Sequence, residues 1–257
     1  MRIPHTALIA ALAASVLLPL PPANAQPQPL PAVHPLPSDA ELDALWAAHK
    51  WNDLGAALSN LDSAAAFSKS MDWLHTRLDA GGGLMLGILY ARDLWVVGKS
   101  RNVTDPATDM RMTAGMITLY TYELIVIDGA KCEDKSAPGH RLEQLLGARR
   151  ETLAYLKQQP QEWKTNVVNI VLAFEKTTAN LRREDDLICR GGLEEYRAGL
   201  ERGTQQEVPN TDGHYGKTVD VRPPTDWVPN FVAPVVYQPL QEKARADMRA
   251  TLLRLIE

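Results

Sequence analysis

The chain has 257 residues, of which 45% are hydrophobic and 23% are charged, and its formal net charge at pH 7 is −4. This composition supports one sizeable hydrophobic core or two small ones. A mildly acidic chain has no long-range attraction for phosphate backbones or anionic lipids, so nucleic acid is a poor candidate partner.

Residues 1–25 have the features of a secretory signal peptide. Arg2 supplies a positive charge, residues 7–18 are apolar, and the A-x-A sequence Ala23-Asn24-Ala25 is a cleavage site before Gln26. The apolar run of about 12 residues is shorter than the ~20 that span a bilayer, so we expect no stable membrane insertion after cleavage. The alanine-rich leader is typical of bacteria, which favours a periplasmic or secreted protein.

Residues 26–37 are a proline-rich linker, which we expect to form an extended tether outside the core. Helical signals follow, beginning with the capping-box spacing of Ser38 and Glu41. Apolar residues recur at helical spacing over residues 38–46, 51–61, 63–79, 84–98, 107–128, 142–156, 160–181, 193–200 and 240–255. The sequence therefore predicts a single all-α domain over residues 38–257, an irregular helical bundle of antiparallel helix pairs.

Residues 204–238 have no helical period and contain several prolines. We expect a long irregular C-terminal arm here, followed by a closing helix. The aromatic residues Trp227, Phe231 and Tyr237 would either fasten this arm to the bundle or make it a lid or a partner-binding arm. Both interpretations stay open.

Residues 62–95 contain a recurring pattern of small and aromatic residues. Its parts are alanines before Trp73-Leu74, the pair Ala80-Gly81 and the run from Leu86 to Arg92. Upstream of it, Trp51 to Gly55 repeat the W-x-x-L-G spacing of such a pattern. The stretch 62–95 resembles a tetratricopeptide-type helical repeat of the Sel variety. The resemblance implies a helical-hairpin scaffold that binds other proteins and has no catalytic residues.

Cys132 and Cys189 are the two cysteines of the chain, and each lies beside an expected helix break. In an exported protein an even number of cysteines favours a disulfide, so we expect these two to pair. A loop of about 57 residues gives about 4 kcal/mol of stabilisation in the chain-entropy model. We expect Ala137-Pro138-Gly139 to form a turn before a helix that begins near His140, and the acidic side chains within residues 128–141 to be solvated.

Two other interpretations of this region, a nucleophile pair and a metal site, are less favoured than the disulfide. A nucleophile pair of Cys132 and His140 needs a reduced thiolate and a third orienting group. A metal site of His140 and Glu143 needs further ligands from other helices. We therefore expect no catalytic residue, no metal site and no cofactor.

Polar side chains interrupt two of the expected apolar helices: Tyr90, Arg92 and Asp93 in one, and Glu123 in the other. A buried charge must be paired or hydrogen-bonded. An internal ion pair of Arg92 with Glu123 or Asp93 is one interpretation. The other is a ligand pocket between these helices, for which Tyr90, Arg92, Glu123 and His140 are the candidate residues.

The sequence as a whole favours an exported, soluble, all-α protein that acts by binding another periplasmic or envelope protein, with an enzyme less favoured. A helix-pair surface and the aromatic arm are the candidate contacts. The alternative is a periplasmic small-molecule-binding protein or hydrolase with a pocket between the central helices. No motif identifies the ligand, the partner or the oligomeric state.

Overall fold

The computed structural model describes residues 37–59, 63–100, 108–209 and 216–257, which belong to one compact unit. The expected signal peptide, residues 1–25, lies outside the described residues, as does the expected linker except for Pro37. No helix of the described ranges has an apolar stretch long enough to cross a membrane.

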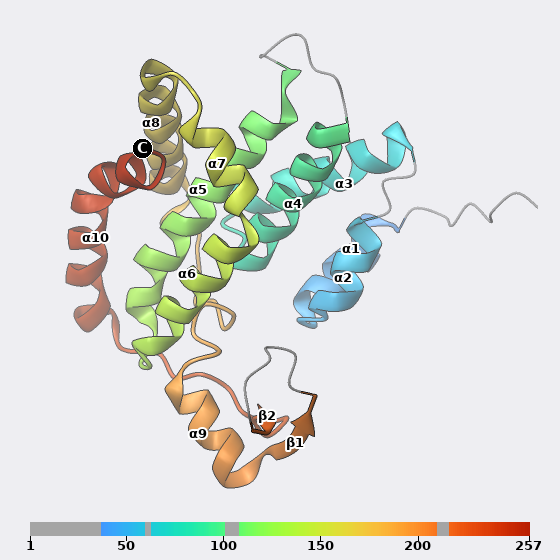
Figure 1. The fold of residues 1–257 in the computed structure, drawn as a ribbon, viewed down its shortest axis with the longest axis vertical. Helices are drawn as coiled ribbons and strands as arrows, with labels where there is room; N and C mark the ends of the chain where they lie inside the picture. The colour runs from blue at the N-terminus through green and yellow to red at the C-terminus, as the bar shows by residue number, and fades with distance from the viewer. Residues whose placement is uncertain (1–36, 60–62, 101–107, 210–215) are drawn as a thin grey trace, which may run out of the picture. The chain divides into compact units, whose positions relative to one another are not determined.

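The described residues form ten α-helices and one two-stranded sheet (Figure 1), which confirms the predicted all-α class. The helices are α1 (Asp39–Ala47), α2 (Trp51–Leu58), α3 (Ala64–Asp79), α4 (Leu84–Ser100), α5 (Met110–Asp128), α6 (Ser136–Ala148), α7 (Arg150–Lys157), α8 (Gln161–Thr178), α9 (Leu193–Arg202) and α10 (Pro234–Leu255). A short 3₁₀ helix, η2 (Gly129–Lys131), follows α5, and the strands are β1 (Thr204–Val208) and β2 (Thr218–Arg222).

Side-chain caps determine where several helices begin. At α1 the predicted capping box is present: Ser38 Oγ accepts from the Glu41 N–H at 3.2 Å, and Glu41 Oε2 accepts from the Ser38 N–H at 2.7 Å. Ser63 caps α3 by accepting from the Ala66 N–H, and Asp109 caps α5 by accepting from the Arg111 N–H. Each cap satisfies a backbone donor that the helix itself leaves unpaired.

The α5 helix lies at the centre of the bundle and contacts α4, α6, α7, α8 and α10 (Figure 1). Its residues Leu119, Tyr120, Leu124 and Ile127 are fully buried, as the nearly uniform apolar sequence predicts. The α4 and α5 helices run antiparallel, because Gly98 lies against Arg111 while the earlier Gly87 lies against the later Thr121. A Cβ at Gly87 would be 2.6 Å from Thr121 Oγ1, so glycine permits this close approach.

The stretch that resembles a Sel-type repeat folds as a helix pair, α3 followed by α4. A tight turn at Ala80–Gly83 connects the two helices, and Gly81 has a φ of 83°, a left-handed conformation that favours glycine. The helical hairpin implied by the resemblance is therefore present in this part of the chain.

Three expected boundaries were wrong. The helix expected near His140 begins at Ser136, because Pro138 falls in the first turn, where its missing N–H is not needed. The single helix expected over residues 142–156 is divided into α6 and α7 at Arg149. The closing helix begins at Pro234 and includes Pro239, which sequence reasoning placed before it.

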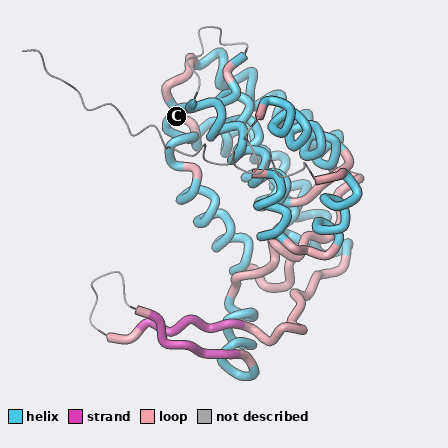
Figure 2. The backbone as a smooth tube through the Cα atoms, turned by 90° about the vertical axis from the view of Figure 1, so that its right-hand side faces the viewer, coloured by secondary structure: helices cyan, strands magenta, loops and turns pink. Residues whose placement is uncertain are grey.

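The arm expected to be irregular over residues 204–238 contains an antiparallel hairpin (Figure 2). Its register runs from Thr204 opposite Arg222 to Val208 opposite Thr218. The hairpin packs on α9, where Gly199 lets β2 approach: a Cβ there would be 2.6 Å from Val221 Cγ1. We call residues 193–209 and 216–229, which contain α9 and this hairpin, the C-terminal lobe.

Candidate functional site

The predicted disulfide between Cys132 and Cys189 is present and buried. Beside it, the Glu133 N–H donates to the Asn230 carbonyl at 3.0 Å and the Val232 N–H donates to the Lys131 carbonyl at 2.9 Å. Three segments distant in sequence therefore meet at one place: residues 131–133, Cys189 and residues 230–232. We call this place the stapled junction; the C-terminal lobe begins and ends next to it.

The N-terminus of α9 is attached to the same junction by side-chain hydrogen bonds. The Glu194 N–H donates to Asp134 Oδ2 at 2.9 Å, and the Leu193 N–H donates to Ser136 Oγ at 2.8 Å. Burial opposes the negative charge of Asp134, but hydrogen bonds from Ser136 and from the Glu194 N–H hold the pKa of this carboxyl below its usual range. Asp134 is thus a helix cap, which corrects the expectation that it is solvated.

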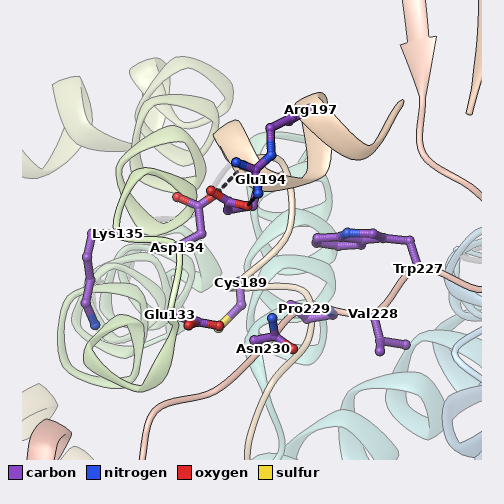
Figure 3. A pocket seen from close by; sticks show the side chains of 10 residues that line it. All are labelled: Glu133, Asp134, Lys135, Cys189, Glu194, Arg197, Trp227, Val228, Pro229 and Asn230. Carbon is purple, nitrogen blue, oxygen red and sulfur yellow. Dashed lines mark hydrogen bonds and ion pairs between the residues drawn. The ribbon is translucent and has the colours of Figure 1, made fainter. Parts of the chain in front are cut away.

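A cavity of about 570 Å³ lies between the stapled junction and the C-terminal lobe (Figure 3). Its lining residues are Glu133, Asp134, Lys135, Cys189, Glu194, Arg197, Trp227, Val228, Pro229 and Asn230. The guanidinium of Arg190 lies 5.3 Å from the centre of the Trp227 ring, a cation–π contact that holds this wall of the cavity in place.

The cations that line this cavity are already paired, whereas one of its anions is not. Lys135 Nζ donates to the carbonyl oxygens of Ala130 and Cys132, and Arg197 Nη2 lies 2.6 Å from Glu194 Oε2. The Glu133 carboxylate makes no hydrogen bond or ion pair with any described residue. The charge that the cavity offers to another molecule is therefore negative.

The α9 helix exposes its apolar residues to solvent. Leu193, Tyr196 and Leu200 are 70%, 53% and 45% exposed, although their i, i+3, i+7 spacing is typical of a buried helix face. The small residues Ala198 and Gly199 are the ones that are buried. We call Leu193, Tyr196 and Leu200 the apolar stripe. Arg197 lines the cavity and lies one helical turn after Leu193, on the same side of α9.

The three aromatic residues of the expected arm have different environments. Trp227 lines the cavity (Figure 3). Phe231 packs against a small buried cluster that includes both cysteines. Tyr237 belongs to α10, and Lys131 Nζ lies 6.0 Å from its ring centre. Phe231 thus packs at the stapled junction and Tyr237 lies near Lys131 beside it, whereas Trp227 lines the cavity.

The four candidate pocket residues lie in separate environments. The ring of Tyr90 lies 6.4 Å from that of His75, and exposed His140 is hydrogen-bonded to Gln144. Of the two partners expected for Arg92, the structure pairs it with Asp93: Arg92 Nε lies 2.7 Å from Asp93 Oδ1.

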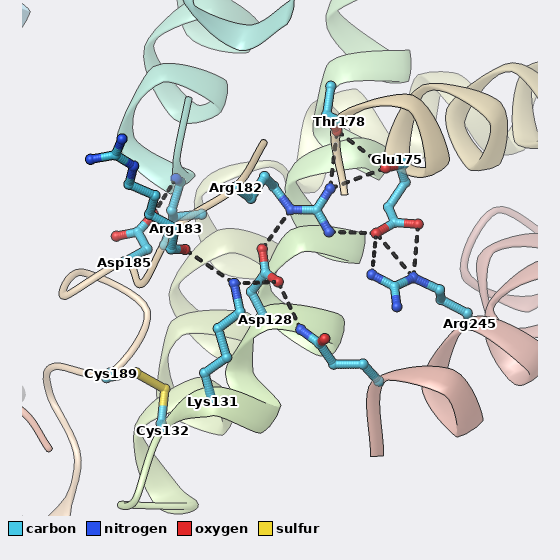
Figure 4. A network of polar contacts seen from close by, with 12 residues as sticks. Asp128, Lys131, Cys132, Glu175, Thr178, Arg182, Arg183, Asp185, Cys189 and Arg245 are labelled. Atoms are coloured by element: carbon cyan, nitrogen blue, oxygen red, sulfur yellow. Dashed lines mark hydrogen bonds and ion pairs between the residues drawn. A yellow bond between two sulfur atoms is a disulfide. The ribbon is translucent and has the colours of Figure 1, made fainter. Parts of the chain in front are cut away.

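The fourth, Glu123, lies in a buried polar network that sequence reasoning did not predict (Figure 4 shows its neighbours). Arg182 Nε lies 2.6 Å from Asp128 Oδ2, and Arg182 also contacts Glu175, which Arg245 Nη2 approaches to 3.0 Å. Burial opposes the charge on Glu175, but hydrogen bonds from Arg245 and Arg182 lower its pKa. Glu123 Oε2 has no partner among the described residues, and burial together with the Glu175 charge raises the pKa of Glu123 to about 8.

Comparison of the chain with protein-family models, with curated proteins and with solved structures found no match. Membership of the Sel-type repeat family therefore stays a prediction. Among the described residues, no group of three or more His, Cys, Asp or Glu side chains is arranged to hold a metal ion.

Proposed function

We propose that the protein is exported to the periplasm and binds another protein through its C-terminal lobe. The observation that supports this most directly is the exposure of the apolar stripe on α9. Apolar surface that lies in water is favourable to cover, and aromatic and aliphatic anchors of this kind dominate the energy of many protein interfaces.

The surface around the stripe indicates the chemistry of the partner. Val228, which is also exposed, lies beside Trp227 at the edge of the cavity, and the unpaired Glu133 carboxylate lines the same cavity. A partner segment with apolar side chains would cover the stripe, and a neighbouring lysine or arginine would reach Glu133. We therefore propose a basic, amphipathic segment of another protein as the ligand of this surface.

The attachment of the lobe supports the same function. The disulfide, the backbone pairing of residues 131–133 with residues 230–232, and the Asp134 cap all lie at the base of α9. A surface held in place before binding loses less conformational entropy on association, which increases affinity.

Site-specific photo-crosslinking in the producing cell tests this proposal. The photoreactive amino acid p-benzoylphenylalanine is introduced at Tyr196 or, as a matched control, at Ile170, which lies on α8 and is 56% exposed. We expect a discrete adduct from position 196 and none from position 170. The partner is then identified by mass spectrometry, purified and titrated against the mature protein.

Two substitutions decide whether the contact is the proposed one. Leu200→Glu places a charge in the stripe and Glu133→Lys reverses the charge of the cavity; each should weaken binding of the purified partner by about tenfold or more. Equal adducts at positions 196 and 170, or unchanged affinity of both variants, would contradict the proposal. The intact mass of the exported protein should start at Gln26 and be two hydrogens light; a chain that retains residues 1–25 would refute the expected export.

A further inference from the structure

A second cavity, of about 680 Å³, is lined by no residue of the C-terminal lobe. It is enclosed by the corner between α1 and α2, the turn before α4, the α4 and α5 helices, and residues 181–186. Its volume falls within the range of about 300–1,000 Å³ that is usual for small-molecule sites. We call it the helix-end cavity.

The interior of the helix-end cavity is apolar on one side. Leu86 and Leu124 are buried at its base, and the half-buried side chains of Trp46, Trp51 and Met85 form its wall. Such a combination of leucine, methionine and tryptophan accommodates an aliphatic chain or a ring through dispersion and burial of apolar area.

The other side of the base is the Arg182 end of the buried polar network (Figure 4). The guanidinium of Arg182 is already bonded to Asp128, Glu175 and Thr178. Burial opposes its charge, but Asp128 and Glu175 raise the pKa of Arg182 above its usual range. Because this cation is already paired, the base of the cavity offers no free positive charge to an anionic ligand.

The rim of the cavity is negative. Glu184 and Asp186 supply carboxylates, while Arg183 supplies the opposing cation, and the side chains of Glu184 and Arg183 pair with no other described residue. His49 has a φ of 53°, which turns the α1–α2 corner so that its ring stacks on Trp51 and its Nδ1 lies 3.8 Å from Asp186 Oδ2. His49 therefore occupies both the Trp51 ring face and the Asp186 carboxylate, and the rim carboxylate left for an organic cation is that of Glu184.

We infer that the helix-end cavity binds a small cationic amphiphile, with its apolar body against Trp46, Met85 and Leu86 and its ammonium group at the unpaired Glu184 carboxylate of the rim. This site does not depend on the proposed function of the C-terminal lobe, because the two cavities share no residue. The protein thus has a ligand site at one end of α4 and a protein-binding surface on α9.

Calorimetric titration of the mature protein with three probes of equal chain length tests this inference. The probes are octyltrimethylammonium, 1-octanol and octanoate, each below its micellar concentration. We expect the cation to bind with the highest affinity, the alcohol about tenfold more weakly because it lacks the ammonium–carboxylate contact, and the anion not measurably. Absence of cation binding, or equal affinity for the anion, would overturn the inference.

Variants locate the binding to this cavity. Glu184→Gln should weaken binding of the cation about tenfold and leave binding of the alcohol unchanged. Met85→Trp fills the cavity from a half-buried position, so it should abolish binding of both probes while the circular dichroism spectrum is retained. Trp95→Ala, on the same helix but outside the lining, is the matched control and should bind as the wild type does. Undiminished binding by Met85→Trp would refute the site.

Discussion

Glu123 should make the stability of the protein depend on pH in a direction opposite to that of an ordinary salt-bridged carboxylate. Its side chain is buried, with 1% of the residue exposed, and its Oε2 has no partner among the described residues. Burial and the neighbouring Glu175 charge raise its pKa from 4.5 to about 8. Replacement by glutamine keeps the shape of the protonated carboxyl but removes the titration.

The sign of the effect follows from proton binding. Between about pH 4.5 and about pH 8 the folded protein keeps the Glu123 proton and the unfolded chain releases it, so the free energy of unfolding falls as pH rises. The contribution of the protonated side chain is complete below about pH 4.5 and is lost as pH rises through about 8. At about 1.4 kcal/mol per pH unit, the full effect is roughly 5 kcal/mol.

The assay is denaturant unfolding of wild type and Glu123→Gln, without reductant, at intervals from about pH 5 to about pH 9. We expect the two proteins to differ little at the acidic end and Glu123→Gln to be more stable by several kcal/mol at the alkaline end. Subtracting the two curves removes the titration of groups that the variants share. A difference that does not change with pH would refute the reasoning.

Glu175→Gln is the matched control in the same network. The pKa of Glu175 is lowered because hydrogen bonds from Arg245 and Arg182 outweigh its burial, so its contribution is present at neutral pH and is lost as pH falls through its folded pKa. We therefore expect Glu175→Gln to destabilise the protein at neutral pH, where Glu123→Gln stabilises it. Stabilisation by both variants would show that the assignment of charges in this network is wrong.

Three further predictions follow from the packing. The double substitution of Cys132→Ser and Cys189→Ser should lower the free energy of unfolding by about 4 kcal/mol, and hydrogen exchange should accelerate in α9 more than in α5. Arg182→Met should cost about 3–5 kcal/mol in denaturant unfolding, because it leaves two carboxylates buried without their shared cation; a cost under about 1 kcal/mol would contradict this. Gly87→Val should lower the melting temperature by separating α4 from Thr121, whereas a melting temperature equal to that of the wild type would refute the close approach.

The sequence by itself determined the features that depend on neighbouring residues. Ser38 and Glu41 are three positions apart, so their capping box forms wherever the helix lies. The nearly uniform apolar run of α5 required a central position. The two cysteines, beside helix breaks, had only each other as partners for a disulfide within one chain.

Local patterns were less reliable where a proline lay near a helix start. Pro138 and Pro239 suggested helix boundaries, yet both lie inside helices. The first-turn position of Pro138 requires no N–H, and Pro239 gives up a single hydrogen bond in a long helix. The β1–β2 hairpin was also missed, because short polar strands have no strong periodic signal.

Only the tertiary structure decided which side chains meet and which stay exposed. The spacing of Leu193, Tyr196 and Leu200 predicts an apolar helix face, but nothing local indicates whether another element covers that face. Similarly, Glu123 was recognisable as an unusual charge, whereas its neighbours Glu175 and Arg245 come from helices more than 50 residues away in sequence. Burial and charge pairing depend on the packing of distant segments, so they determine the candidate sites without leaving a pattern in any one stretch of the chain.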